Sequence, residues 1–157
     1  MSSSTSQEVA ILLPLLVSLA TTLTTIAIHA IALLGIVRIA HHEYLLGRAG
    51  TRFWRDVAIV ATVTQLALVA HVVEITIWAA VLGLCGEFNR FAGAFYHSAM
   101  NYTSLGYGDV VMSASWKLLG PLEAANGLLM FGVSTATIFA LIQRLVQSRL
   151  GLGVSDR

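Results

Sequence analysis

Charged residues and cysteine are scarce in this sequence, and each shortage excludes a class of protein. Asp, Glu, Lys and Arg make up 11% of the 157 residues, whereas ordinary soluble domains carry about 25%. So few charges cannot cover a globular protein in water, and the 57% of hydrophobic residues favours lipid as the surrounding solvent. The one cysteine, Cys85, has no partner for a disulfide within the chain, so we interpret it as an ordinary free thiol.

A dominant charge of one sign is also missing. The formal net charge is +1, and the sequence contains no run of basic or acidic residues. Runs of that kind indicate binding to nucleic acid, so we expect no nucleic-acid partner.

The sequence does have three long apolar stretches, and these predict membrane-spanning helices. They are residues 10–37, 57–85 and 118–142. Their only formal charges are Glu74 in the second stretch and Glu123 near the start of the third. A bilayer core of about 30 Å requires roughly 20 helical residues, so each stretch is long enough to span. Residues 1–9 contain no Lys or Arg, which argues against a cleaved signal peptide, and the first stretch is expected to remain as a transmembrane helix.

The basic residues predict how these helices are oriented. Seven of the nine Lys and Arg residues lie between the first and second helices or after the third. By the positive-inside rule, we expect the linker 38–56 and the tail 146–157 to be cytoplasmic. Residues 1–9 then lie outside, in a multi-pass protein of the cell (inner) membrane. Candidate contacts for anionic lipid headgroups in the linker are Arg48, Arg52 and Arg55.

The outward segment between the second and third helices predicts a re-entrant element. Residues 89–102 are rich in apolar and aromatic residues and predict a short helix, with Asn89 as a plausible N-cap. This helix is too short to cross the membrane and return. Backbone that enters a membrane without spanning it is tolerated only where protein or a water-filled cavity surrounds it, so we expect such an environment here.

Residues 103–109 follow directly and read Thr-Ser-Leu-Gly-Tyr-Gly-Asp. This segment closely resembles the selectivity-filter signature of potassium channels, usually Thr-Thr-Val-Gly-Tyr-Gly-Asp. The resemblance covers residues 57–145 and is to the two-helix bacterial members of that family. It implies an outer helix (57–85), a pore helix (89–102), a filter (103–109) and an inner helix (118–145), with 10–37 as an additional transmembrane helix.

The resemblance also implies a fold and a function. The fold is an all-α membrane protein with three transmembrane helices, a re-entrant pore helix and a filter, assembled as a homotetrameric pore. The expected function is passive cation conduction, with potassium as the expected ion, without enzyme activity and without a cofactor other than potassium ions bound in the filter.

The spacing of the motif has a physical basis. A pore that strips water from a potassium ion must offer inward-pointing carbonyl oxygens at consecutive residues. Carbonyls on one side of an extended chain need alternating backbone handedness, which glycine adopts without a Cβ clash. Gly106 and Gly108 alternate with Leu105 and Tyr107 in this way, and four copies around an axis complete the oxygen rings. The expected ion-binding residues are Thr103, Ser104, Leu105, Gly106, Tyr107 and Gly108.

Residues around the filter carry further roles that the resemblance implies. Asp109, Tyr96 and His97 stand where family members have residues that support the filter by hydrogen bonds. Gly127 and Gly132 lie in the stretch whose glycines serve as gating hinges, although close packing of helices explains each equally well.

Two departures from the family motif bear on selectivity. Ser104 keeps the oxygen of the usual threonine but lacks the methyl group that restricts its rotamer. Leu105 is bulkier than the usual valine. A weakly selective cation channel is therefore an alternative to a potassium-selective one.

His71 and Glu74 are polar residues in the middle of the second apolar stretch, where an unpaired charge costs several kcal/mol. Helical spacing places them on one face, which we expect to point into the bundle. They are interpreted as a structural hydrogen-bonded pair, a proton-sensitive gating switch, or a metal site that lacks a third ligand. We expect a hydroxyl of the first helix to satisfy Glu74. The candidates are Thr21, Thr22 and Thr25.

Two other classes of function remain open on the sequence alone. One is a metal-handling membrane protein or enzyme built on His71, Glu74 and the adjacent pair His41 and His42, although adjacent histidines in a basic linker are more often solvated. The other is a non-conducting subunit that retains the pore fold.

Overall fold

The computed structural model describes the backbone of residues 2–150 and the side chains of residues 11–150. Its helices are α1 (Ser2–Leu45), α2 (Phe53–Leu84), α3 (Phe91–Tyr102) and α4 (Leu119–Arg149), and the described residues form no strand. In α1 from Ile11, in α2 and in α4, the helix is long and apolar enough to cross a membrane. The prediction of an all-α fold with three candidate spans and one short helix is confirmed.

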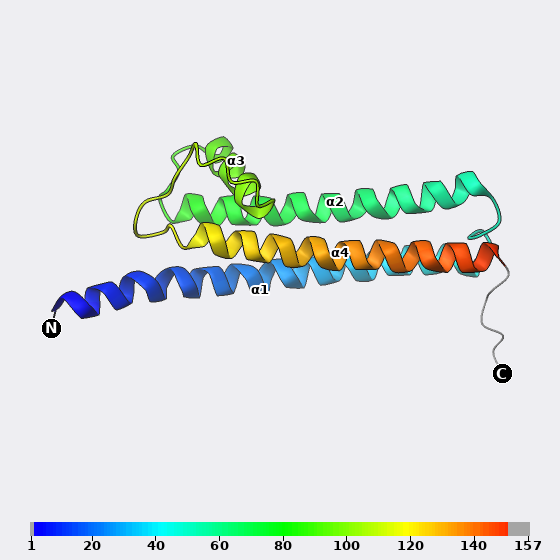
Figure 1. The fold of residues 1–157 in the computed structure, drawn as a ribbon, viewed down its shortest axis with the longest axis horizontal. Coiled ribbons are helices and arrows are strands. Elements are labelled where there is room, and N and C mark those ends of the chain that lie inside the picture. Colours follow the sequence, from blue (N-terminus) through cyan, green and yellow to red (C-terminus); the bar gives the residue numbers. More distant parts are fainter. Residues whose placement is uncertain (1, 151–157) are drawn as a thin grey trace.

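The three long helices lie side by side, and α3 packs at one end of the bundle (Figure 1). The start of α1 lies toward this same end, whereas the α1–α2 connection and the end of α4 lie at the other. α3 contacts α2 and α4, and α1 contacts α2 and α4. The pore-helix region and the basic linker are thus at opposite ends of the molecule.

Helix α1 is longer than the apolar stretch that predicts it. It begins at Ser2 and ends at Leu45, so part of the segments expected as an outer N-terminus and a linker is helical. No proline or glycine occurs between residues 38 and 45 to stop the helix. Gly47, at φ 61°, provides the left-handed residue that ends it. The connection to α2 is therefore only residues 46–52, and α4 likewise runs into the expected tail, to Arg149.

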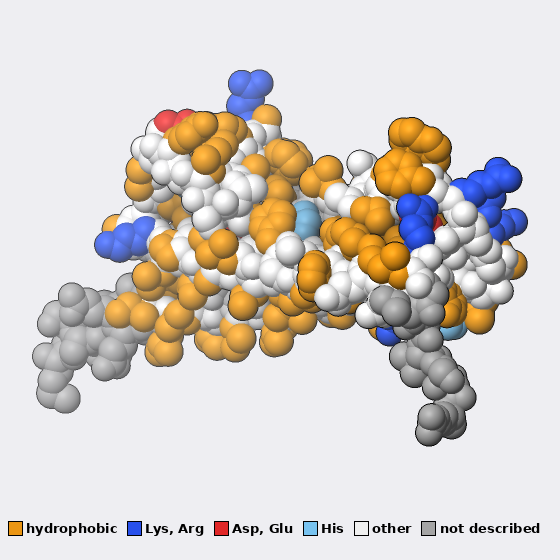
Figure 2. Space-filling view, turned by 45° about the vertical axis from the view of Figure 1, so that its right-hand side comes forward, with side chains coloured by type: hydrophobic (Ala, Val, Ile, Leu, Met, Phe, Trp, Pro, Cys, Tyr) orange, Lys and Arg blue, Asp and Glu red, His pale blue; other side chains and the backbone are white. Residues whose placement is uncertain are grey.

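The interior of the bundle is divided along its length. At the α3 end, a cluster of buried apolar side chains joins α2, α3 and α4. Its buried members are Ile75, Trp78, Leu82, Tyr102, Leu119 and Met130. Smaller apolar clusters around Val63 and Ile59 fill the other half. The visible outer face is covered by hydrophobic side chains, with Lys and Arg only toward the two ends (Figure 2).

Candidate functional site

The filter segment (residues 103–109) begins where α3 ends. Ser104 lies in the left-handed region at φ 58°, and its neighbour Leu105 donates its backbone N–H to the carbonyl of Met100 at 2.9 Å. This is the bond that closes a Schellman-type helix end, in which glycine usually takes the left-handed position. The turn directs the chain away from the axis of α3 and into residues 105–109.

The backbone of the filter segment alternates in handedness. Ser104, Gly106 and Gly108 have φ values of 58°, 51° and 73°, and Leu105 and Tyr107 between them do not have positive φ. Ser104 is the only non-glycine residue of the described part with positive φ. Sequence reasoning anticipated the two glycines but not the serine, because the residue type gives no sign of this conformation.

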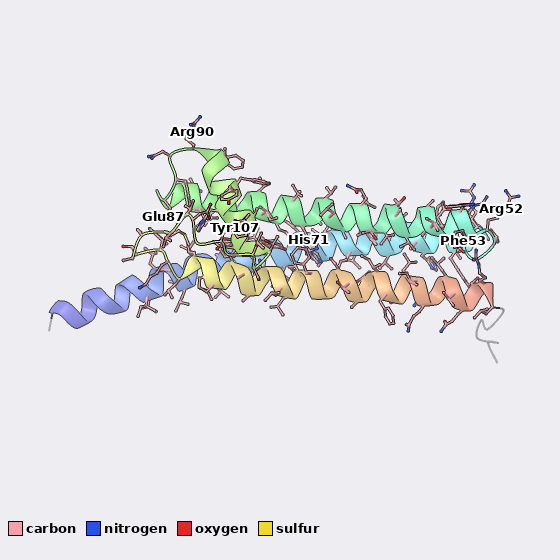
Figure 3. All side chains as sticks on the ribbon, turned by 45° about the horizontal axis from the view of Figure 1, so that its top comes forward. Arg52, Phe53, His71, Glu87, Arg90 and Tyr107 are labelled. Atoms are coloured by element: carbon pink, nitrogen blue, oxygen red, sulfur yellow. The ribbon has the colours of Figure 1, made fainter. Side chains whose placement is uncertain are left out.

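Large side chains of the filter segment and of the turn after it are exposed in the single chain. Leu105 is 52% exposed, Tyr107 68% and Val111 79%. A Cβ added to Gly106 or Gly108 would meet no atom within 4 Å. Figure 3 shows Tyr107 toward the α3 end of the bundle, and Arg52 and Phe53 at the other end. This surface is open to contact with other molecules.

Two side chains, one on α3 and one in the loop between α2 and α3, hold the filter segment and the turn after it. The Tyr96 hydroxyl donates to Oδ2 of Asp109 at 2.9 Å, and this hydrogen bond raises the pKa of Tyr96. Glu87, just after α2, accepts hydrogen bonds from the backbone N–H and the hydroxyl of Ser113 at 2.7 and 2.6 Å. The first pair joins residues that the motif singled out. The second was missed, because nothing in the sequence pairs two loop residues this far apart.

His97 does not share in this support within the single chain. Its side chain is buried against the ring of Phe88, with ring centroids 5.2 Å apart, and Nε2 has no hydrogen-bond partner among the described residues. Burial lowers the pKa of His97. The imidazole is therefore held neutral behind the filter segment.

A closed ring of hydrogen bonds lies beneath the filter segment. His29 Nδ1 is 2.7 Å from Oε1 of Glu74, and the Tyr102 hydroxyl donates to Oε2 of Glu74. His71 Nδ1 is 3.2 Å from the Tyr102 hydroxyl. The Ser134 hydroxyl closes the ring, at 3.1 Å from His29 Nε2 and 3.2 Å from His71 Nε2. This polar ring joins all four helices and is buried throughout.

The predicted hydrogen bond between Glu74 and a threonine of the first helix is wrong. Thr21 and Thr25 donate their hydroxyls to carbonyls of their own helix, those of Val17 and Thr22, and His29 pairs with Glu74 instead. The prediction compared depths along the two helices counted from residues 37 and 57, whereas α1 ends at Leu45 and α2 begins at Phe53, and the packing of the two helices brings His29 to Glu74. The predicted proximity of His71 and Glu74 does hold, with Nδ1 and Oε2 3.5 Å apart.

A second buried polar group lies between the ring and the α3 end. Glu123 is fully buried and hydrogen-bonds with the Ser98 hydroxyl, which also lies 2.9 Å from the carbonyl of Ile75. Asn126 donates to the Thr25 hydroxyl oxygen at 2.9 Å. In the sequence, Glu123 is only a charged residue in an apolar stretch. Its partner, Ser98, cannot be predicted without knowing how α3 packs on α4.

The two candidate hinge glycines differ in their surroundings. A Cβ at Gly127 would clash with the backbone carbonyl of Tyr102, whereas a Cβ at Gly132 would meet nothing within 4 Å. Gly127 therefore permits close contact between α4 and the end of α3. Gly132 has no such role in the single chain.

The basic and histidine residues of the linker region lie far from the polar ring. His41 and His42 are exposed near the end of α1 and take no part in the buried group of His29, His71 and Glu74. Arg48 lies 3.6 Å from Glu43, while Arg52 and Arg55 are exposed. The structure does not bring His41 and His42 together with His71 and Glu74.

Comparison with known families identifies part of this chain. Residues 70–144 match a family model described as an ion channel. No curated protein and no solved structure matches the chain. The matched segment runs from the middle of α2 through α3 and the filter segment into α4. This segment, nearly half of the chain, thus resembles an ion channel of the two-transmembrane type, as the motif led us to expect. Together with the three apolar helices, the match supports a multi-pass membrane protein.

Proposed function

We propose that four copies of this chain assemble around a common axis into a channel that conducts potassium ions passively. The observation that carries the proposal is the alternation of left-handed and ordinary backbone at residues 104–108. Such alternation allows successive carbonyl oxygens to face one side of the chain, as a cation filter requires. The ion-binding residues would be Thr103, Ser104, Leu105, Gly106, Tyr107 and Gly108.

The exposed side chains of the filter segment and of the turn after it support a fourfold assembly. Leu105, Tyr107 and Val111 are each at least half exposed on the single chain, and a pore built from this segment needs neighbouring copies to enclose it. Closed cyclic symmetry is the usual way in which identical chains satisfy such a requirement. No enzymatic step is part of this function, and potassium ions in the filter are the only bound group it requires.

A potassium flux assay on purified protein in liposomes tests the proposal. Gly106→Ala places a Cβ on a residue at φ 51°, at a cost of about 1–2 kcal/mol per chain, and should abolish flux. Gly35→Ala is the matched control, because an added Cβ there meets nothing within 4 Å and no positive φ is involved. Equal flux in the wild type and in Gly106→Ala would refute the proposal.

A weakly selective cation channel is the second candidate, favoured by the left-handed Ser104 at the filter entrance. Strain at this residue can loosen the innermost oxygen ring. The reversal potential in mixed sodium and potassium separates the two. A value near the potassium equilibrium potential supports selectivity, and a value near zero supports the alternative.

A further inference from the structure

The polar ring contains a set of donor atoms suited to a metal ion. His29, His71 and Glu74 each offer one ligand atom, and these atoms all lie within 4.8 Å of one another. Two imidazoles and a carboxylate form a donor set that zinc uses in proteins, at about 2.0–2.2 Å from the ion. Ligand atoms in such a tetrahedron lie about 3.3 Å apart, so two donors at the widest separation need to move by only about 0.7 Å each.

The hydrogens of the ring can be counted. Its members are His29, His71, Glu74, Tyr102 and Ser134, joined by five hydrogen bonds. When every member is neutral, each contributes one mobile hydrogen. Five hydrogens then serve five bonds, and the ring is satisfied at zero net charge. That count matters in a membrane interior, where uncompensated charge is strongly unfavourable.

We propose that this ring binds one divalent transition-metal ion per chain, of the zinc type. The ligands are Nδ1 of His29, Nδ1 of His71, the carboxylate of Glu74 and the phenolate oxygen of Tyr102. Two positive charges on the ion balance the ionised Glu74 and Tyr102, so the site again carries zero net charge.

The surroundings of the imidazoles fit this arrangement. Histidines that bind metal through one nitrogen usually donate the other N–H to an oxygen. The Nε2 atoms of His29 and His71 both lie within hydrogen-bond distance of the Ser134 hydroxyl, at 3.1 and 3.2 Å. A hydroxyl oxygen has two lone pairs and can accept both hydrogens. Its own hydrogen can then bond to the carbonyl one helical turn back.

The third and fourth ligands were not evident from the sequence. His71 and Glu74 alone are too few for a stable site, and His29 and Tyr102 come from two other helices. A bound ion would fasten α1 and α2 to the last residue of α3, next to the filter segment. The proposal does not depend on conduction and is tested without it.

A cobalt titration tests the site. The assembled protein in detergent, with any polyhistidine tag removed, is stripped of metal with a chelator and titrated with Co²⁺. We expect one Co²⁺ per chain and the intense visible bands of tetrahedral cobalt. Zn²⁺ added afterwards should bleach the bands.

Variants assign the ligands. Glu74→Gln should abolish the bands, and Tyr102→Phe should weaken binding by at least about tenfold. The double variant His41→Ala/His42→Ala, which alters exposed histidines outside the ring, should bind as the wild type does. If Glu74→Gln does not assemble, His29→Gln retains a polar side chain and gives the same test. Absence of the bands in the wild type, their survival in Glu74→Gln or His29→Gln, or their loss in the double variant would each overturn the proposal.

Discussion

At the scale of single residues, the backbone conformation of Ser104 sets the entrance to the filter segment. A side chain at φ 58° is strained by contact between Cβ and the following carbonyl. Threonine, the residue usual at this position in the family, is bulkier at Cβ. The serine is thus the smaller of the two hydroxyl residues at a place where the backbone leaves little room.

Replacement of this serine separates its backbone role from its hydroxyl. Ser104→Gly removes the strain and should stabilise the assembled protein by about 1 kcal/mol per chain, seen as a higher melting temperature. Ser104→Ala keeps the Cβ and should leave the melting temperature close to the wild-type value. An equal rise in both variants would show that the hydroxyl, and not the backbone, is the source of the effect.

The buried His97 predicts a dependence of stability on pH. Burial lowers its pKa in the folded protein, so the unfolded chain takes up a proton first as the pH falls. Stability from this residue is present above its ordinary pKa of about 6.5 and declines as the pH falls below that value. The melting temperature of His97→Phe, measured from pH 7.5 to 5, should fall less steeply than that of the wild type. Parallel curves would contradict this prediction.

At the scale of helices, the packing of α4 against α3 depends on the absence of a side chain at Gly127. Gly127→Ala forces a Cβ against the carbonyl of Tyr102, and overpacking of this kind costs about 1–3 kcal/mol. Gly132→Ala has open space and should assemble normally. Size-exclusion chromatography and thermal unfolding of the two variants test the contrast, and equal behaviour of both would exclude the packing role of Gly127.

The sequence predicts which helices exist but not how they are aligned. Long apolar runs define the spans because lipid leaves the backbone no other way to satisfy its hydrogen bonds. Alignment depends on where each helix ends and on how the helices pack, and in the structure the partner of Glu74 is His29 rather than a threonine. The contacts of Tyr102 and Ser134 depend on the packing of four helices together. No pattern within one helix contains that information.

At the scale of the whole molecule, the two ends of the bundle differ in character. The α3 end carries the filter segment, and the other end carries the α1–α2 connection with Arg52 (Figure 3). The distribution of basic residues predicts that the α3 end is outside the cell.

Thiol labelling tests this orientation. In a Cys85→Ser background, Ser115→Cys lies at an exposed position between the filter segment and α4, and Thr51→Cys lies at an exposed position between α1 and α2. A membrane-impermeant maleimide applied to intact cells should label the first variant and spare the second until the cells are lysed. Labelling of Thr51→Cys in intact cells would reverse the predicted orientation.

The polar ring cannot form without the first helix, because one of its five members lies on α1. His29 belongs to α1, whereas the other four members of the ring lie within residues 70–144, the segment that matches the ion-channel family model. A chain shortened to two spans would lose the imidazole that lies 2.7 Å from the buried Glu74 carboxylate. Conversely, α1 joined to a different pore would carry His29 without its hydrogen-bond partners. The five side chains can therefore be exchanged between channels only as one unit. The junctions of a chimera should lie outside the segment that contains all five.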